Sequence, residues 1–350
     1  MLSLPARDLV VAPLDDDARW NAFVQSAPDA TFCHLAEWRG IMQDTLGHEW
    51  IARAAVTSDG AVAGVLPLVR MKSRIFGHQL VSIPFLNYGG PIGAEAAQLT
   101  LMQWAAEAAR ASRADVLELR ARHELPNTEQ IRSTHHKLTV ILDLPQQEDE
   151  LWSRFSSKLR SQIRRPQKEG MHFSIGVDQV LPFYDVFSRN MRDLGTPVHP
   201  RAFFEQLPRA FGDRVLFGVV YMGDVPVAAG CGFLWKNEFE ITWASARREY
   251  KRMAPNMMLY WEFMRTVISR GGRAFNFGRC SPESSTHKFK LQWSGHDEPL
   301  GWARWSREDG REAPSADSRM FTLASNAWRR LPLPVANLLG PIVARRLAAF

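Results

Sequence analysis

Residues 238–280 carry the stretch that decides the fold, EFEITWASARREYKRMAPNMMLYWEFMRTVISRGGRAFNFGRC. Its first part, 238–244, alternates polar and apolar residues, which predicts a strand with one buried face. A basic loop over 250–256 follows, and Pro255 suits the first turn of a helix. Apolar residues then recur every three or four positions, which predicts a helix that the glycine pair at 271–272 ends.

Residues 274–278 predict a second strand directly after this helix. A loop rich in Ser, Pro and Thr follows, and the cationic run 287–291 is expected to form a further strand. A strand–helix–strand unit with cationic loops at one end is suited to binding an anionic group that bears an acyl chain. The alternative is an ordinary α/β unit with solvated charges.

Composition sets the broad class of the protein. The chain has 350 residues, 45% of them apolar and 23% charged, which is globular composition with enough length for two domains. The net charge of +6 and the pI near 9.4 favour phosphate-rich partners or an anionic surface. Three cysteines, Cys33, Cys231 and Cys280, form no CxxC pair or zinc spacing, so we expect neither a disulfide framework nor a metal.

The sequence also bears on location. The first residues lack a basic region followed by an apolar one, and no apolar run is long enough to span a bilayer. We therefore expect a cytoplasmic protein. Peripheral attachment to the inner membrane is compatible with that location.

The order of elements occurs twice along the chain. Helix, helix, hairpin, strand, helix, strand is predicted over about 15–144 and again over about 180–307, with Gly/Asp turns at 58–60 and 222–224 in the two hairpins. Such recurrence suggests a duplicated fold. We expect a mixed α/β chain with domain boundaries at 1–145, 146–310 and, for a linker and helical tail, 311–350.

The tail has a distinctive charge pattern. From Trp328 onward there are four arginines and no acidic residue, after a helix expected over 319–330. An interfacial segment that touches a membrane is one interpretation. Packing of the tail on its own domain is the other.

The segment 151–170 concentrates the basic charge. It contains six basic residues and one acidic residue, and on a helical wheel Trp152, Phe155, Leu159 and Ile163 form one apolar stripe. The cations on the other side repel one another unless an anion neutralises them. Arginine forks suit phosphate oxygens, so we expect phosphate binding, with a solvated basic face as the alternative. Pro166 is expected to kink or end the helix.

Three stretches together resemble the FemAB family. They are KLRSQIRRPQKEG at 158–170, FGR at 277–279 and HKFKLQWSG at 287–295, and the loop 84–91 resembles the strand entry of the family's first domain. The likeness covers roughly 15–307 and is greatest to FemAB-like proteins of exosortase (PEP-CTERM) and exopolysaccharide gene clusters.

The resemblance implies two tandem GNAT-like acyltransferase domains. Family members transfer an aminoacyl group from aminoacyl-tRNA to an amine of a lipid- or nucleotide-linked cell-wall peptide. The family's lysine in its Phe-Lys motif matches Lys290, which is expected to be catalytic because a fixed ammonium stabilises an oxyanion. No bound cofactor is expected, and the acyl donor is either aminoacyl-tRNA or acyl-CoA.

The remaining site residues follow from charge and position. Phosphate-bearing substrate is expected to contact the cations Lys158, Arg160, Arg164, Arg165, Arg279 and Lys288. The loop 247–256 lacks the glycines with which a CoA-dependent GNAT holds pyrophosphate. In their place, Arg248, Lys251 and Arg252 are candidates for binding donor phosphate by side chain.

Other candidates carry less weight. Cys280 is a candidate nucleophile at the strand end, with a buried idle thiol as the alternative. Glu238 or Glu240 is a candidate general base, but alternation places both on one strand face, for which solvent exposure is the simpler account. The histidines show no spacing that supports a metal.

We therefore expect an N-acyltransferase that acts on an amine of a phosphate-bearing precursor in peptidoglycan or exopolysaccharide synthesis. One rival is acyl-CoA-dependent N-acetylation of an amino sugar. Another is a non-catalytic basic module that binds RNA, such as tRNA, or a membrane surface.

Overall fold

The computed structural model divides the chain into two compact units. It describes residues 9–73, 76–134, 136–308 and 319–347. Unit 1 contains residues 1–137, 299–318 and 345–350, and unit 2 contains residues 138–298 and 319–344. The expected boundaries at 145 and 310 differ from this division. The strand at 138–143 pairs in the sheet of unit 2, and the strand at 302–306 pairs in a sheet of unit 1.

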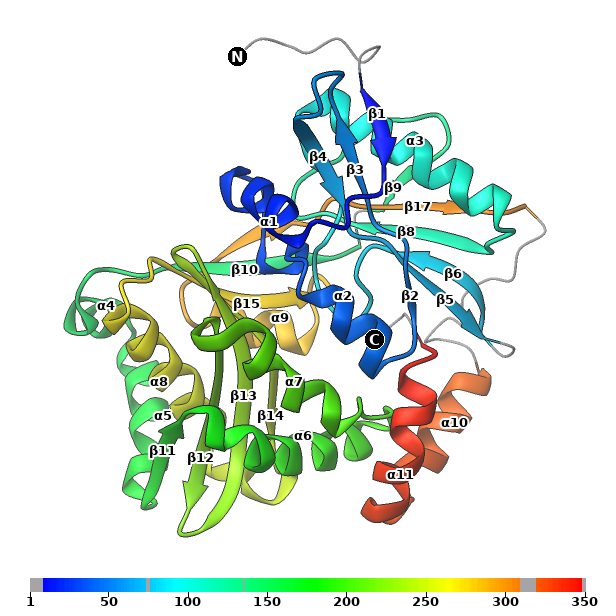
Figure 1. The fold of residues 1–350 in the computed structure, drawn as a ribbon. Helices are drawn as coiled ribbons and strands as arrows, with labels where there is room; N and C mark the ends of the chain where they lie inside the picture. Colours follow the sequence, from blue (N-terminus) through cyan, green and yellow to red (C-terminus); the bar gives the residue numbers. More distant parts are fainter. Residues whose placement is uncertain (1–8, 74–75, 135, 309–318, 348–350) are drawn as a thin grey trace. The chain divides into compact units, whose positions relative to one another are not determined.

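Unit 2 is built on a seven-stranded sheet (Figure 1). In spatial order its strands are β11 (Met171–Ile175), β12 (Val215–Met222), β13 (Val225–Trp235), β14 (Glu238–Ala246), β15 (Ala274–Cys280), β10 (Leu138–Asp143) and β16 (His296–Pro299). Strands β11 to β14 form an antiparallel meander. Strands β14 and β15 are parallel, since helix α8 (Pro255–Ser269) connects them.

Helices cover both faces of this sheet. Phe263 of α8 lies over Gly218, whereas Phe183 of α6 (Val180–Leu194) contacts Phe217 with ring centroids 5.2 Å apart. Neighbouring residues of a strand point to opposite faces, so α8 and α6 cover opposite faces. The other helices of unit 2 are α4 (Glu148–Arg154), α5 (Ser157–Lys168), α7 (Arg201–Phe211), α9 (Ser285–Leu291), α10 (Arg319–Arg329) and α11 (Leu333–Ala344), with 3-10 turns η4 (Val177–Gln179), η5 (Gly212–Arg214) and η6 (Arg248–Met253).

Two facing glycines let α8 approach the sheet closely. Gly218 and Gly230 are register partners on β12 and β13, and a Cβ on either would lie 2.8 Å from the ring of Phe263. We expect Gly230→Ala to lower the free energy of unfolding by about 1–3 kcal/mol, since overpacking a dense core forces side chains off their rotamers. Denaturant unfolding measures this change.

Gly40→Ala is the matched control, because Gly40 is helical and the nearest atom to its added Cβ is a flexible carboxylate oxygen at 3.6 Å. It should be neutral or slightly stabilising. Equal stability of Gly230→Ala and the unaltered chain would show that α8 does not rest on this glycine pair.

Unit 1 contains two sheets and a long helix. The four-stranded sheet has the order β1 (Val10–Ala12), β3 (Arg53–Val56), β4 (Val62–Leu66) and β7 (Ile92–Gly93); the six-stranded sheet has the order β2 (Glu49–Trp50), β5 (Val69–Ser73), β6 (Gly77–Val81), β8 (Val116–Arg120), β17 (Trp302–Ser306) and β9 (Arg132–Thr134). The helical elements are α1 (Asp17–Ser26), η2 (Phe32–His34), α2 (Trp38–Gly40), η3 (Ile41–Thr45) and α3 (Glu95–Ala111). Buried alanines of α3 let it pack tightly on the strands.

The two units repeat one sheet topology. In unit 1 the parallel pair β6 and β8 is joined by α3, and β17 lies antiparallel beside β8. In unit 2 the parallel pair β14 and β15 is joined by α8, and β10 lies antiparallel beside β15. In the sequence, β10 follows the first segment of unit 1 but belongs to unit 2. Likewise, β17 follows the main segment of unit 2 but belongs to unit 1. The mixed α/β class and the repeated element order expected from the sequence are both present.

The C-terminal helices pack on unit 2. Arg192 of α6 donates to the carbonyl of Leu331 at 3.1 Å, and Asn337 of α11 donates to the Ser188 hydroxyl at 3.4 Å. Part of the expected linker, residues 309–318, lies outside the described residues. Among the residues that the structure describes, no helix combines the length and apolar character needed to cross a bilayer.

Candidate functional site

The parallel strands β14 and β15 diverge part-way along their length. In the described chain their pairing consists of three residue pairs, the last being Glu240 with Asn276. Beyond this point β14 remains paired with β13 up to Ala246, and β15 remains paired with β10 up to Cys280. Beyond Glu240 and Asn276 the facing edges of β14 and β15 therefore no longer pair with one another, and we call this divergence the wedge.

A buried polar network bends β15 at the opening of the wedge. The Asn276 side-chain oxygen accepts from the Gly278 backbone N–H at 2.8 Å and from the Thr139 hydroxyl at 2.6 Å. Gly278 has φ of +69°, a conformation that favours glycine. The Phe-Gly-Arg segment thus forms a bulge within β15, directly after the last residue pair that β15 shares with β14.

Glu240 lies at the vertex of the wedge and is buried. The Thr242 hydroxyl donates to its carboxylate at 3.3 Å, and Glu238, two residues earlier, accepts from the Asn276 amide at 2.9 Å. The simpler sequence account, in which this strand face meets solvent, is wrong for Glu240, because helices cover both faces of the sheet. A buried carboxylate beside a strand opening is placed to take a proton.

Lys290 lies on helix α9, which begins where the Ser284 hydroxyl accepts from the His287 N–H at 3.2 Å. The expected strand over 287–291 is therefore wrong, and an N-capped helix takes its place. The Lys290 side chain is only 3% exposed. Its ammonium donates to the carbonyl of Gly278 at 2.5 Å and to that of Arg279 at 2.9 Å.

Burial lowers the pKa of Lys290 to about 8, while the neighbouring Cys280 and Glu240 partly oppose this by favouring the charged form, and Arg279 lowers it further. The ammonium is thus removed from water and held by carbonyl oxygens at the bent end of β15. A desolvated cation interacts with a developing negative charge far more strongly than a solvated one does.

A second hydrogen-bond network holds α9 in place. His287 is buried; its Nδ1 accepts from the Glu283 N–H at 3.0 Å and its Nε2 lies 2.9 Å from the Asp297 carboxylate. Within the described ranges no cluster of histidine, cysteine or acidic residues is arranged to hold a metal. Cys280 of β15 is a buried thiol adjacent to Lys290. Lys288, which lies on α9 with Lys290, is exposed.

The basic segment forms two helices in place of one. Helix α4 ends at Arg154, and α5 starts at Ser157 because the Ser156 hydroxyl accepts from the Leu159 N–H at 3.2 Å. The helix continues through Pro166 and ends at Lys168, two residues later, so it does not end at the proline itself. Because proline has no N–H, the Gln162 carbonyl lacks the partner that residue 166 would otherwise supply.

The cations of α5 point outward. Leu159 and Ile163 are buried, Lys158, Arg164 and Arg165 are exposed, and Arg160 is half-buried. In the part of the chain that the structure describes, these four cations form no ion pair. They remain able to bind an anion.

Aromatic side chains link this helix to the region of Lys290. The Arg164 guanidinium lies 5.0 Å from the centre of the Trp152 ring, and Trp152 lies 5.0 Å from Trp261 of α8. Phe155 contacts both Trp261 and Trp293, the latter three residues after Lys290. The structure brings Lys290, Arg279, Cys280 and Glu240 together. No hydrogen bond or ion pair among the described residues joins the α5 cations to them.

The loop before α8 presents a third cationic group. Arg248, Lys251 and Arg252 on η6 are exposed, whereas Arg247 is bound to Asp185 of α6. Ala254 precedes the helix with φ of +55°, a left-handed conformation that costs a non-glycine residue about 1–2 kcal/mol. The side chains on η6 and the N-terminal end of the α8 dipole together favour a phosphate at this position.

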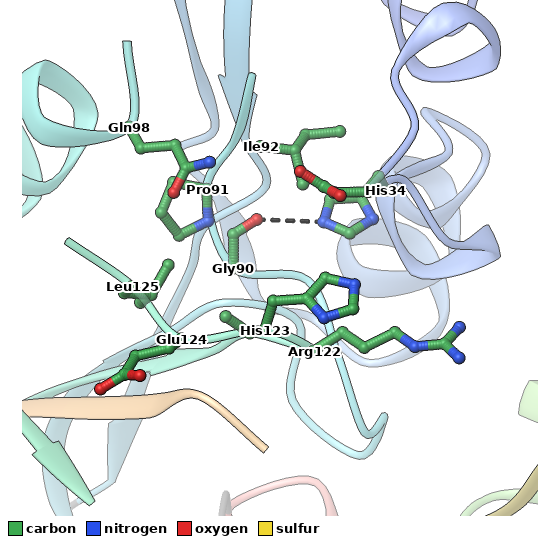
Figure 2. Close-up of a pocket in the computed structure, with 11 residues that line it drawn as sticks. His34, Gly90, Pro91, Ile92, Gln98, Arg122, His123, Glu124 and Leu125 are labelled. Carbon is green, nitrogen blue, oxygen red and sulfur yellow. Dashed lines mark hydrogen bonds between the residues drawn. The ribbon is translucent and has the colours of Figure 1, made fainter. Parts of the chain in front are cut away.

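Unit 1 has a pocket at the corresponding end of its own parallel pair (Figure 2). It lies between residues 90–92, after β6, and 121–125, after β8, and His34 donates from Nε2 to the Gly90 carbonyl at 3.0 Å. Burial lowers the pKa of His34 to about 4, so the ring is neutral at pH 7. The cavity of about 70 Å³ holds only a few waters.

Comparisons with known proteins bear on the fold. Residues 153–290 match the acetyltransferase (GNAT) domain family. No curated protein matches the chain. Among solved structures, FemX has a TM-score of 0.64 at 14% identity over 85% of this chain and 97% of FemX.

Two other solved structures have similar folds. The C-terminal domain of a putative lysylphosphatidylglycerol synthetase from Agrobacterium fabrum has a TM-score of 0.56 at 13% identity, over 89% of this chain and 96% of that one. A tandem GNAT protein from the clavulanic acid biosynthesis pathway has a TM-score of 0.52 at 12% identity, over 87% and 100%. The chain thus has the fold of tandem GNAT proteins, and its GNAT domain contains the wedge and Lys290.

Proposed function

We propose that this chain is an N-acyltransferase that moves an aminoacyl or acyl group from an activated donor to an amine of a phosphate-bearing cell-envelope precursor. The wedge between β14 and β15, with Lys290 and Glu240 buried beside it, carries the proposal. The acyl donor enters between the diverging strands, where its polar groups make hydrogen bonds with backbone groups of β14 that no longer pair with β15. Its phosphates meet Arg248, Lys251 and Arg252.

In the proposed reaction the acceptor nitrogen attacks the donor carbonyl carbon. The C–O bond of an aminoacyl-tRNA ester or the C–S bond of an acyl-CoA thioester then breaks. Glu240 accepts the proton that the amine loses and delivers it to the departing oxygen or sulfur, while the Lys290 ammonium stabilises the negative charge on the carbonyl oxygen. Arg160, Arg164 and Arg165 of α5, with Lys158, Lys288 and Arg279, are assigned to the acceptor phosphate.

The sequence resemblance to the FemAB family supports an aminoacyl donor and a peptidoglycan or exopolysaccharide precursor as acceptor. The fold likeness to a putative lysylphosphatidylglycerol synthetase is consistent with an aminoacyl group carried to a phosphate-bearing acceptor. Acyl-CoA-dependent N-acetylation of an amino sugar uses the same wedge and differs only in donor and acceptor.

A donor screen tests the proposal. The full chain is incubated with charged tRNA or with acyl-CoA, together with muropeptide, amino-sugar nucleotide or lipid-linked amine acceptors, and amide products are identified by mass spectrometry. Amide formation with one donor class supports the proposal. Salt-dependent RNA binding without turnover on any donor would assign the chain to the non-catalytic module instead.

Arg164→Ala is expected to raise the acceptor KM about tenfold or more with little change in kcat, because it removes a charge-assisted hydrogen bond to phosphate. Steady-state kinetics at fixed donor concentration measure this split. Arg154→Ala is the matched control, since Arg154 is already paired with Glu150 on the preceding helix. An unaltered acceptor KM in Arg164→Ala would support the alternative interpretation, in which the cations of α5 form a solvated basic face.

A further inference from the structure

Helix α11 presents an apolar strip to solvent. The exposed fractions are 38% for Val335, 71% for Leu338, 40% for Leu339 and 44% for Ile342. Their spacing of i, i+3, i+4 and i+7 places all four side chains on one helix face. Large side chains gathered in this way differ from the single exposed hydrophobic residues found on most surfaces.

The opposite face of α11 is already occupied. Ala336, Gly340 and Ala344 are buried, and a Cβ on Gly340 would lie 2.9 Å from a Val198 methyl group. Small residues thus seat the helix on unit 2 while the larger residues point away from it. The exposed strip is therefore not needed to hold α11 in place.

Positive charge flanks this strip in the sequence. Arg329 and Arg330 precede α11, Arg345 and Arg346 follow it, and no acidic residue occurs from Trp328 to Phe350. Arg330 and Arg346 are exposed. An apolar strip between clusters of arginine matches a surface that is apolar beneath an anionic layer.

We propose that α11 docks on the surface of an anionic lipid bilayer, with Leu338 and Ile342 inserted below the headgroups and the flanking arginines among the phosphates. The helix lies in the plane of the surface and does not cross it. A second copy of the chain is a poorer occupant, because a two-fold contact brings the same patch of both subunits together and opposes arginine to arginine. Docking is independent of the proposed acyl transfer, and would hold the chain beside lipid-linked acceptors.

Vesicle co-sedimentation of the full chain tests the proposal. Vesicles of equal parts phosphatidylglycerol and phosphatidylcholine should bind the chain, and pure phosphatidylcholine should bind it at least about tenfold more weakly. Leu338→Gln with Ile342→Gln should lower partitioning into the anionic vesicles by about tenfold or more, since the apolar area that enters the bilayer is lost. Arg330→Gln with Arg346→Gln should weaken binding mainly at low salt.

Val177→Gln with Leu181→Gln is the matched control, because these two hydrophobic residues are also exposed on unit 2 but lie outside α11. This pair should leave partitioning unchanged. Equal binding by the α11 variant, or equal binding to both vesicle types, would overturn the proposal. So would a concentration-dependent dimer in sedimentation equilibrium that the α11 substitutions dissociate. None of these readouts depends on turnover, so failure here leaves the acyl-transfer proposal intact.

Discussion

Lys290→Met is expected to lower kcat by about a hundredfold or more, because a single preorganised donor to a developing oxyanion commonly contributes that much. Methionine keeps an unbranched chain of similar length and removes only the charge and the N–H donors. The Asn276 side chain still accepts from the Gly278 N–H at 2.8 Å, so the bent end of β15 keeps one of its supports. Single-turnover transfer with saturating donor measures the effect on the chemical step.

The pH dependence separates a catalytic from a structural lysine. Since the pKa of Lys290 is about 8, activity that needs its ammonium should fall as pH rises through 8, and Lys290→Met should lack this limb. Stability changes in the opposite direction. The unfolded chain has the higher lysine pKa and binds more protons between about pH 8 and 10.5, so this group makes the fold more stable as pH rises through that range.

Lys72→Met, an exposed lysine of unit 1, is the matched control and should change neither kcat nor its pH profile. Undiminished turnover by Lys290→Met, with the limb near pH 8 still present, would remove Lys290 from the chemistry. A folded variant that has lost donor binding as well as turnover would assign Lys290 to positioning of β15.

Glu240→Gln is expected to lower kcat by about 10²–10⁴-fold, since an attacking amine must lose a proton and Glu240 is the buried carboxylate at the vertex of the wedge. Glutamine preserves size and the contact from the Thr242 hydroxyl. The KM for donor should change little, because the carboxylate is not assigned to phosphate or to the acyl chain. The acid limb of kcat/KM should disappear together with the base.

Glu238→Gln is a close control, because Glu238 lies on the same strand face two residues away and bonds to Asn276. Its effect on kcat should stay within about tenfold. If the two substitutions had equal effects, or if only Glu238→Gln reduced kcat, Glu240 would not be the base.

The sequence predicted the fold class well because its signals are local. Period-two alternation over 238–244 and three- to four-residue spacing after Pro255 identify β14 and α8 without reference to the rest of the chain. The hairpin turn at Asp59-Gly60 was likewise found from nearby residues. The duplicated order followed from such elements, and the repeated sheet topology accounts for it.

Long-range pairing lay beyond this kind of prediction. Strand β17 pairs with β8, although unit 2 separates the two strands in the sequence, and no local pattern indicates such a partner. The exposure of Glu240 was predicted wrongly for the same reason, since burial of a strand face depends on helices elsewhere in the chain. The direction of the Lys290 side chain depends on the cap at Ser284, which a search for strand patterns overlooks.

The chemistry of the site was predicted in part. Cationic segments were identified from composition, and the structure places Lys290, Arg279, Cys280 and Glu240 together. Convergence of the α5 cations on Lys290 stays a prediction, with the aromatic side chains of Trp152, Phe155 and Trp293 as the observed connection. The wedge itself could not be seen in the sequence, because it arises from where two strands stop pairing.

Hydrogen–deuterium exchange with and without donor tests most directly whether the wedge of unit 2 is the acyl-transfer site. Acyl-CoA and charged tRNA are added separately to the full chain, and peptides from both units are compared. The account predicts that the productive donor slows exchange over residues 241–254 and 277–280 and leaves the pocket around Gly90 unchanged. Protection confined to unit 1, or a donor that is turned over without protecting β14 and β15, would contradict it.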